Sequence, residues 1–187
     1  MSLCAVLQPT VMQTPPACPS AGLAAEPGPQ GLPPRQPVQA WVALGANLGD
    51  ARASVRAAIE AIGCLPHTRL LRASSLYRSA PWQAEGADFI NAVAHLQTHL
   101  NAPDLLRALQ ALEQAAGRER PWRHAPRTLD LDLLEYGSAR IASDWLTLPH
   151  PRLHERAFVL LPLAEISPER VSAAALARVA GQRIEKL

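Results

Sequence analysis

Apolar positions follow two different spacings along the chain from about residue 38 onward. Short runs that are apolar, or that alternate apolar with polar side chains, favour β-strands. Four segments are therefore expected to be strands: 40–44, 68–77, 89–100 and 128–136. Two other segments place apolar side chains every three or four positions, as an amphipathic helix does. Asp50 is a suitable N-cap for the first, 50–63, and Pro103 suits the first turn of the second, 103–117.

The order of these elements is β-α-β-β-α-β, which is typical of an α+β, ferredoxin-like domain with helices packed on an antiparallel sheet. Extra elements follow toward the C-terminus. Residues 140–142 are expected to pair beside the last strand, 158–166 form an apolar segment, and 173–180 favour a short helix. Four residues are expected to form the buried stripe of the second long helix: Leu105, Leu109, Leu112 and Ala116.

The first 37 residues differ in composition from the rest. They hold half of the chain's 18 prolines and only two charged side chains, whereas every aromatic residue lies from Trp41 onward. Proline removes backbone donors, and a segment without aromatic side chains has little with which to build a core. We therefore expect residues 1–37 to be a disordered, proline-rich leader and residues 38–187 to be a single folded domain.

Charge and hydropathy narrow the function classes. The net charge is +2 and the mean hydropathy is −0.02. This basic excess is too weak to suggest nucleic-acid binding, and no apolar run approaches the roughly 18 residues of a membrane span. Three scattered cysteines suggest neither a disulfide framework nor a zinc site, and they favour a reducing compartment. We expect a cytoplasmic monomer that binds neither nucleic acid nor membranes.

The strongest chemical signal is a pair of carboxylates near residue 131. Asp130 and Asp132 are two positions apart in an expected strand, so both side chains project from one face, with Cα atoms roughly 6.6–7 Å apart. Leucines occupy the alternate positions and fill the other face. Two close carboxylates repel each other, and divalent cations that bridge to phosphate oxygens relieve that repulsion.

Arginines are concentrated just before this pair. They are Arg118, Arg120, Arg123 and Arg127. Guanidinium groups suit phosphate recognition because their planar donors match phosphate oxygens. An acidic pair for metal beside an arginine-rich segment for phosphate indicates phosphoryl or nucleotidyl transfer.

Several motifs resemble the 6-hydroxymethyl-7,8-dihydropterin pyrophosphokinase family, which transfers pyrophosphate from ATP to a pterin in folate synthesis. Residues 126–132 (PRTLDLD) look like the signature of the family. Further matches follow the family's order: 44–49 (LGANLG), 74–78 (SSLYR), 89–92 (FINA) and 148–151 (LPHP). The matches span about residues 40–166, and the resemblance implies the same ferredoxin-like fold.

The resemblance also implies a role for each matching residue. Asp130 and Asp132 would hold two Mg²⁺ ions, and Arg118 and Arg127 would assist phosphate transfer. The implied ATP contacts are Gln110, Glu113, Arg127, Thr147, His150 and Arg156. The implied pterin contacts are Ser79, Trp82, Phe89, Asn91, Trp122, Asp130 and Phe158.

The implied reaction is the Mg²⁺-dependent transfer of pyrophosphate from ATP to the pterin hydroxymethyl group, which gives AMP and the pterin diphosphate. Two alternatives remain open. A palm-type, metal-dependent nucleotidyltransferase also carries paired carboxylates on a ferredoxin-like sheet, but it releases pyrophosphate. A non-catalytic ferredoxin-like binding module would turn over nothing, although acidic residues and few aromatics make this sheet a poor RNA-binding surface.

Overall fold

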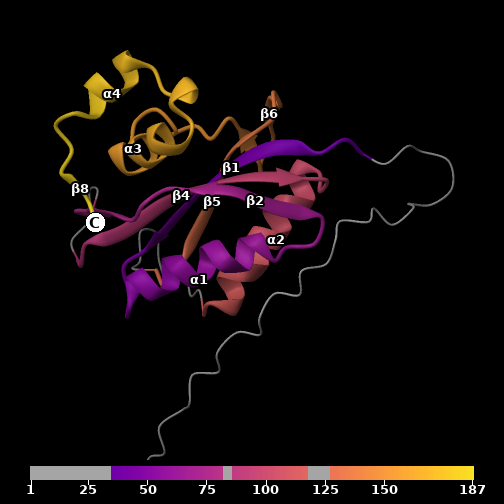
Figure 1. Ribbon diagram of the computed structural model, residues 1–187, viewed down its shortest axis with the longest axis horizontal. Coiled ribbons are helices and arrows are strands. Elements are labelled where there is room, and N and C mark those ends of the chain that lie inside the picture. The colour runs from indigo at the N-terminus through magenta and orange to yellow at the C-terminus, as the bar shows by residue number, and fades with distance from the viewer. Residues whose placement is uncertain (1–34, 82–85, 118–126) are drawn as a thin grey trace, which may run out of the picture.

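A six-stranded antiparallel sheet forms the centre of the protein (Figure 1). The computed structural model describes residues 35–81, 86–117 and 127–187. The strands are β1 (Val38–Ala46), β2 (Thr68–Ala73), β3 (Tyr77–Ser79), β4 (Phe89–Thr98), β5 (Asp130–Tyr136) and β8 (Ile184–Lys186). Their order is β5-β1-β4-β3-β8, and β2 also pairs with β4. This arrangement confirms the predicted α+β, ferredoxin-like fold.

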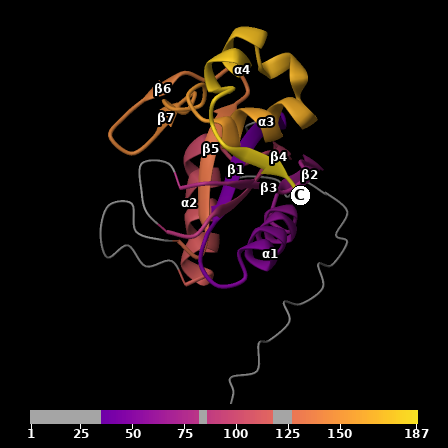
Figure 2. The same cartoon turned by 90° about the vertical axis from the view of Figure 1, so that its left-hand side faces the viewer.

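Helices lie on both faces of the sheet. α1 (Ala51–Gly63) and α2 (Ala102–Ala115) lie side by side on one face, as Figure 2 shows. α3 (Ala157–Ile166) covers the opposite face, and α4 (Ala173–Val179) packs on α3. A 3-10 helix, Pro168–Arg170, follows α3. The two C-terminal helices therefore add a layer that the basic ferredoxin-like pattern does not contain.

The strands supply a different apolar core to each face because their side chains alternate. Leu44 and Leu96 point toward α1 and α2 and pack with Val55 and Leu109 from those helices. Trp41, on the other face, packs in the α3-side cluster with members such as Leu163 of α3. A sheet buried on both faces fixes its register strongly, since a shift by one residue would exchange the two sets.

The predicted helix caps are present, but one position of the buried stripe is wrong. Asp50 caps α1 by accepting a hydrogen bond from Ala53 N at 3.0 Å. In α2, Leu105 and Leu109 are fully buried, whereas the expected stripe member Ala116 is exposed because the helix ends at Ala115. Glu113, with 3% exposure, occupies the buried face instead.

The segment 68–77 forms two strands rather than the predicted single strand. Ser74 interrupts it: its backbone N donates to Val93 O, and its Oγ accepts from Val93 N, both at 2.9 Å. A hydroxyl thus takes the place of a backbone acceptor, and the ladder breaks between β2 and β3. The local alternation of side chains contains no signal for this substitution.

The segment 140–142 also pairs differently from the prediction. β6 (Ile141–Ala142) pairs with β7 (Thr147–Leu148) in a separate two-stranded sheet, and not with β5. Figure 2 shows this hairpin projecting beside the β5 edge of the main sheet. β5 consequently remains an edge strand. The short C-terminal strand β8 was not predicted at all.

Among the helices in the three described segments, none combines the length and hydrophobicity that a bilayer span requires.

Candidate active site

The candidate site is built on β5, at the open edge of the sheet. Asp130 and Asp132 project from the face that α3 covers, while Leu131 and Leu133 project into the core beneath α1 and α2. The shared face of the two carboxylates was predicted from the period of a strand. A bulge follows, because the register shifts between Trp41 and Val42 of β1 and lets β5 place both Leu133 and Leu134 inside the protein.

A buried asparagine positions the start of β5. Asn47, just after β1, donates its backbone N–H to Arg127 O at 3.0 Å, and its Oδ1 accepts from Arg127 N at 2.8 Å. Its Nδ2 contacts Ala87 O at 3.5 Å, before β4. Arg127 in turn pairs with Asp130 through its guanidinium. Sequence reasoning missed this role of Asn47, and its only signal was membership in the LGANLG motif.

The electrostatics of Asp132 differ from those of an ordinary exposed carboxylate. Burial raises the pKa of Asp132, and the neighbouring carboxylate of Asp130 raises it further. Three positive or titratable side chains act in the opposite direction: His150, Arg156 and Arg127. The net direction is upward, so the ionised form of Asp132 is disfavoured in the folded protein and would be stabilised by an added cation.

His150 and Arg156 face the carboxylates from the segment between β7 and α3. Burial lowers the pKa of His150, although Asp132 acts in the opposite direction. The His150 backbone N donates to Leu134 O at 2.8 Å, and its Nδ1 accepts from Arg152 N at 3.2 Å, so both the backbone and the ring are held. The guanidinium of Arg156 lies 5.3 Å from the centroid of the Phe158 ring, within cation–π range.

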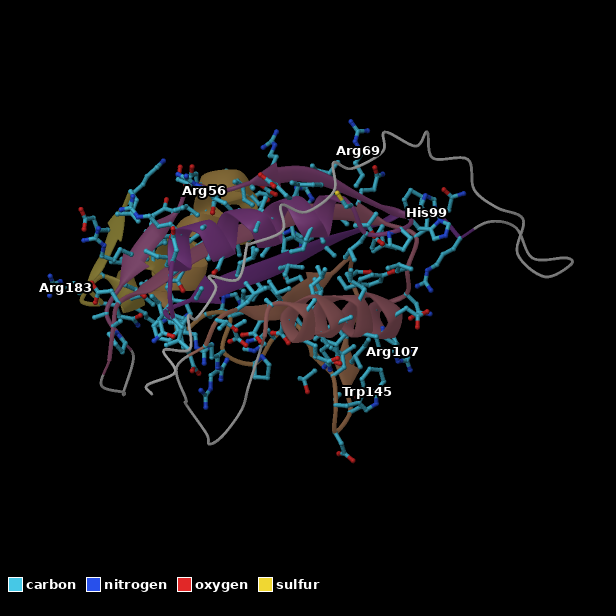
Figure 3. The ribbon with its side chains drawn as sticks, turned by 90° about the horizontal axis from the view of Figure 1, so that it is seen from below. Arg56, Arg69, His99, Arg107, Trp145 and Arg183 are labelled. Atoms are coloured by element: carbon cyan, nitrogen blue, oxygen red, sulfur yellow. The ribbon has the colours of Figure 1, made fainter. Side chains whose placement is uncertain are left out.

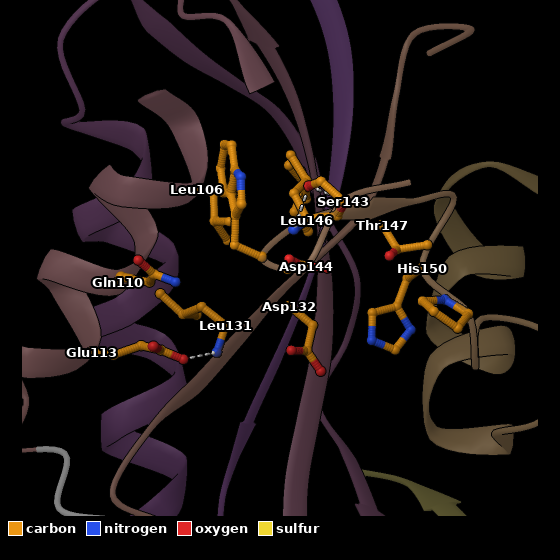
Figure 4. A pocket seen from close by; sticks show the side chains of 13 residues that line it. Leu106, Gln110, Glu113, Leu131, Asp132, Ser143, Asp144, Leu146, Thr147 and His150 are labelled. Atoms are coloured by element: carbon orange, nitrogen blue, oxygen red, sulfur yellow. Dashed lines mark hydrogen bonds between the residues drawn. The ribbon is translucent and has the colours of Figure 1, made fainter. Parts of the chain in front are cut away.

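A cavity of about 370 Å³ lies beside β5, between α2 and the β6–β7 hairpin. Figure 4 shows Gln110 and Glu113 of α2 on one side, and Thr147 and His150 on the other, with Asp132 between them. Glu113 Oε1 accepts a hydrogen bond from Leu131 N at 2.6 Å, which ties the helix to the edge strand. The cavity has the size of a small-molecule site. It thus brings together five of the side chains singled out from the sequence.

A second group of predicted residues surrounds Gly45 on β1. Asn91 and Asp130 are the two strand neighbours of Gly45, one on β4 and the other on β5. Asn91 Nδ2 donates to Ser79 Oγ at 3.0 Å, and both side chains are buried. A Cβ on Gly45 would lie 3.4 Å from Asn91 Oδ1. The absence of a side chain there leaves a flat floor between the amide and the carboxylate.

The two aromatic candidates of this group lie on different elements. Phe89 is two positions before Asn91 on β4, so the two side chains share a face, as predicted. Phe158, near the start of α3, packs half-buried against the α3-side cluster. Ala43, whose register partner on β5 is Asp132, packs half-buried against the same cluster. Three other predicted site residues lie outside the described part of the chain: Trp82, Arg118 and Trp122.

The donor set limits how a metal ion could bind. Within the described segments, no group of three or more His, Cys, Asp or Glu side chains could hold an ion. Asp130 and Asp132 provide two carboxylates, which fits Mg²⁺, because this ion commonly takes one or two protein carboxylates and completes its shell with substrate phosphates and water. The raised pKa of Asp132 agrees with this fit, because a bound cation would stabilise the ionised carboxylate.

Fold and site together define a class. A ferredoxin-like domain with paired carboxylates, an arginine and a histidine around a cavity at the sheet edge has the groups that phosphate-transferring enzymes use. The profile of the 7,8-dihydro-6-hydroxymethylpterin-pyrophosphokinase (HPPK) family matches residues 41–168. The chain belongs to this family and is an ATP-dependent pyrophosphokinase.

Individual relatives agree with the family match. The 2-amino-4-hydroxy-6-hydroxymethyldihydropteridine pyrophosphokinase of Pseudomonas aeruginosa is 47% identical over 130 residues, which cover 69% of this chain and 80% of that protein. The enzyme of the same name from Methylorubrum extorquens is 40% identical over 134 residues, covering 71% and 85%. A crystal structure of Plasmodium falciparum HPPK-DHPS aligns with a TM-score of 0.57 at 14% identity. It covers 79% of this chain but only 43% of that longer one, so it supports the fold alone.

Proposed function

We propose that the protein transfers pyrophosphate from ATP to the hydroxymethyl group of 6-hydroxymethyl-7,8-dihydropterin, in folate biosynthesis. The hydroxymethyl oxygen attacks the β-phosphorus, the bond from that phosphorus to the α-bridging oxygen breaks, and AMP leaves. The hydroxyl proton passes to solvent water in the same step. The observation that carries this proposal is the position of Asp130. It is the neighbour of Gly45 on β5, as Asn91 is on β4, and it lies on the strand that borders the cavity of about 370 Å³.

The cavity beside β5 is the site we assign to ATP. Its wall includes Gln110, Glu113, Thr147 and His150, and the outer side of β5 pairs with no further strand. Two backbone groups of this edge are already used, because Leu131 N donates to Glu113 and Leu134 O accepts from His150 N. Other outward backbone groups of such an edge can hydrogen-bond the rim of a nucleobase. Arg127 and Arg156 supply positive charge near the carboxylates, and we assign them, together with Arg118, to the phosphates.

Asp130 and Asp132 are the residues we assign to two Mg²⁺ ions. Bound there, the ions would neutralise charge on the triphosphate and hold donor and acceptor oxygens in register. Arg127 would then exchange part of its pairing with Asp130 for phosphate oxygens. Guanidinium groups held in this way stabilise mainly the transition state, in which negative charge spreads over the transferred group.

The pterin is assigned to the floor around Gly45. Asn91, fixed by Ser79, presents an amide that can read the hydrogen-bonding edge of a pterin ring. Phe89 and Phe158 provide flat apolar surfaces for the ring faces, and Asp130 lies on the side toward ATP. Trp82 and Trp122 complete the proposed set on the basis of the family resemblance.

We also propose that residues 38–187 form the catalytic domain and act as a monomer in the cytoplasm, where ATP is available. Residues 1–37 are proposed to be dispensable for the reaction. No second polypeptide is needed for the carboxylates, the cavity and the Asn91 group, because all of them come from this chain.

One assay separates the proposal from its alternatives. The protein is incubated with ATP, Mg²⁺ and 6-hydroxymethyl-7,8-dihydropterin, and the products are separated by chromatography. AMP and pterin diphosphate in equal amounts are expected. Pyrophosphate with an adenylylated acceptor would instead support a nucleotidyltransferase, and binding without any turnover would support a non-catalytic module. Omitting Mg²⁺ is the control, and turnover that persists with chelator present would contradict the assigned role of the carboxylate pair.

A further inference from the structure

The turn between β6 and β7 presents an exposed tryptophan to the cavity. Trp145 is 56% exposed, far more than the other described aromatic side chains, and it lines the cavity with Leu106 of α2. Figure 3 shows Trp145 on the same side of the ribbon as Arg107, the next residue of α2. A large indole left this open on a stable domain is a candidate contact for a ligand rather than a core residue.

The turn that carries Trp145 is held firmly at its base. Ser143 N donates to Leu146 O at 3.1 Å, and Leu146 N donates to Ser143 Oγ at 3.1 Å. Leu146 and Leu148 are buried in the core beneath α1 and α2. The indole therefore projects from a fixed platform, which lowers the entropy that a ligand contact would cost.

Charge orients a nucleotide within the cavity. Asp144 lines the cavity beside Trp145 and would repel phosphates, whereas His150 lies at the part of the cavity that adjoins Arg156. Leu106 and Leu146 make the wall near the turn apolar. The triphosphate is thus directed toward His150 and the carboxylate pair, and the base is directed toward the turn.

We propose that Trp145 is a specificity-determining residue that stacks on the nucleobase of the donor nucleotide and favours a purine over a pyrimidine. This inference rests on the proposed function, which assigns the cavity to ATP. A purine offers a larger face than a pyrimidine to an indole, and stacking needs no particular hydrogen-bond partner. Trp145 lies away from the reacting phosphorus, so its contact is made equally in the ground state and the transition state.

The test measures binding of a non-hydrolysable ATP analogue and of inorganic tripolyphosphate to the full chain by calorimetry. Trp145→Ala should weaken analogue binding about tenfold, and Trp145→Leu nearly as much, while Trp145→Phe retains most of the affinity. Tripolyphosphate has no base, so its affinity should be the same in all of these variants. Leu71→Ala is the matched control, because Leu71 is an exposed apolar side chain on β2 that does not line the cavity.

Kinetics provide a second readout that a purely structural role would not move. Trp145→Ala should raise KM for ATP about tenfold with kcat nearly unchanged, and it should reduce the preference for ATP over CTP. KM for the pterin should stay constant. Equal analogue binding by Trp145→Ala and the unmodified protein, or an equal loss of tripolyphosphate binding, would overturn the inference while leaving the proposed function intact. Failure of the unmodified protein to bind the analogue at all would overturn both.

Discussion

Two acidic groups on the same side of the sheet show opposite electrostatics. Glu165, on α3, accepts hydrogen bonds from Ser75 N, Ser75 Oγ and Tyr77 Oη and pairs with Lys186 Nζ at 3.2 Å. Burial alone would raise the pKa of Glu165, but these hydrogen bonds outweigh it and hold the pKa below its ordinary value. Asp132, on β5, has its pKa raised by burial and by Asp130.

The difference separates a structural carboxylate from the one proposed to be functional. Glu165 joins α3 to β3 and β8 and is satisfied by the protein itself, so its charge contributes to stability. Burial, and to a smaller extent the hydrogen bond to Glu165, raises the pKa of Tyr77 to about 12. The surroundings of Asp132 instead do not fully compensate its negative charge, and a bound substrate complex can supply the missing positive charge. A carboxylate in this condition is a candidate for binding and chemistry, which agrees with the role we propose for Asp132.

Replacing Asp132 should produce the largest effect. Asp132→Ala removes a proposed metal ligand, so turnover should fall on the order of 10³-fold or more. The raised pKa means that ionised Asp132 destabilises the folded state above about pH 4, so the variant without ligands should be as stable as the original or slightly more stable at pH 7. Steady-state kinetics and thermal unfolding measure the two quantities.

Glu60→Ala, which removes an exposed carboxylate from α1, is the control for that variant and should change neither quantity. If Asp132→Ala unfolded, Asp132 would belong with Glu165 as a structural residue and the contrast between the two groups would be lost.

Replacing Asn47 should affect both stability and activity. Asn47→Ala leaves Arg127 N without its acceptor and should cost about 1–3 kcal/mol of unfolding free energy. It also loosens Arg127, so kcat should fall about tenfold. Asn101→Ala is a matched control, because it removes the cap of α2 and about 1 kcal/mol without touching the site. An equal kcat for the two asparagine variants would show that Asn47 acts only on stability.

Replacing Glu165 should change stability and leave catalysis alone. Glu165→Gln should lower the unfolding free energy by about 1 kcal/mol at pH 7, since hydrogen bonds to a charged, partly exposed group are lost. The folded pKa of Glu165 lies below the unfolded value near 4.3, so its stabilisation is complete above that pH. It is lost as the pH falls through the lower folded pKa. Unfolding of both proteins across pH 2–7 should therefore show the gap closing in acid, and a constant gap would contradict the assigned role.

Removing the leader should have the smallest effect. Deleting residues 1–34 should leave the melting temperature and turnover close to those of the full chain, because the segment is rich in proline and poor in core-forming side chains. The cut is placed before Arg35, whose guanidinium lies 5.9 Å from the centroid of the Tyr136 ring and whose carbonyl contacts His99 Nδ1 at 2.7 Å. A deletion of 1–37 should be the less stable of the two. A large loss in the shorter deletion would show that the leader supports the domain.

Local pattern alone predicted the features of this protein that depend on near neighbours in the chain. The spacing of apolar residues predicted β1, α1, β4 and α2, since each is defined by its own periodicity. The shared face of Asp130 and Asp132 followed from the strand period. The family resemblance, carried by short motifs, predicted five of the side chains that line the cavity: Gln110, Glu113, Asp132, Thr147 and His150.

The tertiary structure decided everything that depends on groups far apart in the sequence. The break at Ser74 needs Val93, the position of Arg127 needs Asn47, and the burial of Glu113 depends on its hydrogen bond to Leu131 N. The periodicity of the sequence indicates which face a side chain occupies, but it does not indicate which residue that side chain contacts there. The raised pKa of Asp132 and the cavity beside Trp145 arise only when the folded chain brings those partners together.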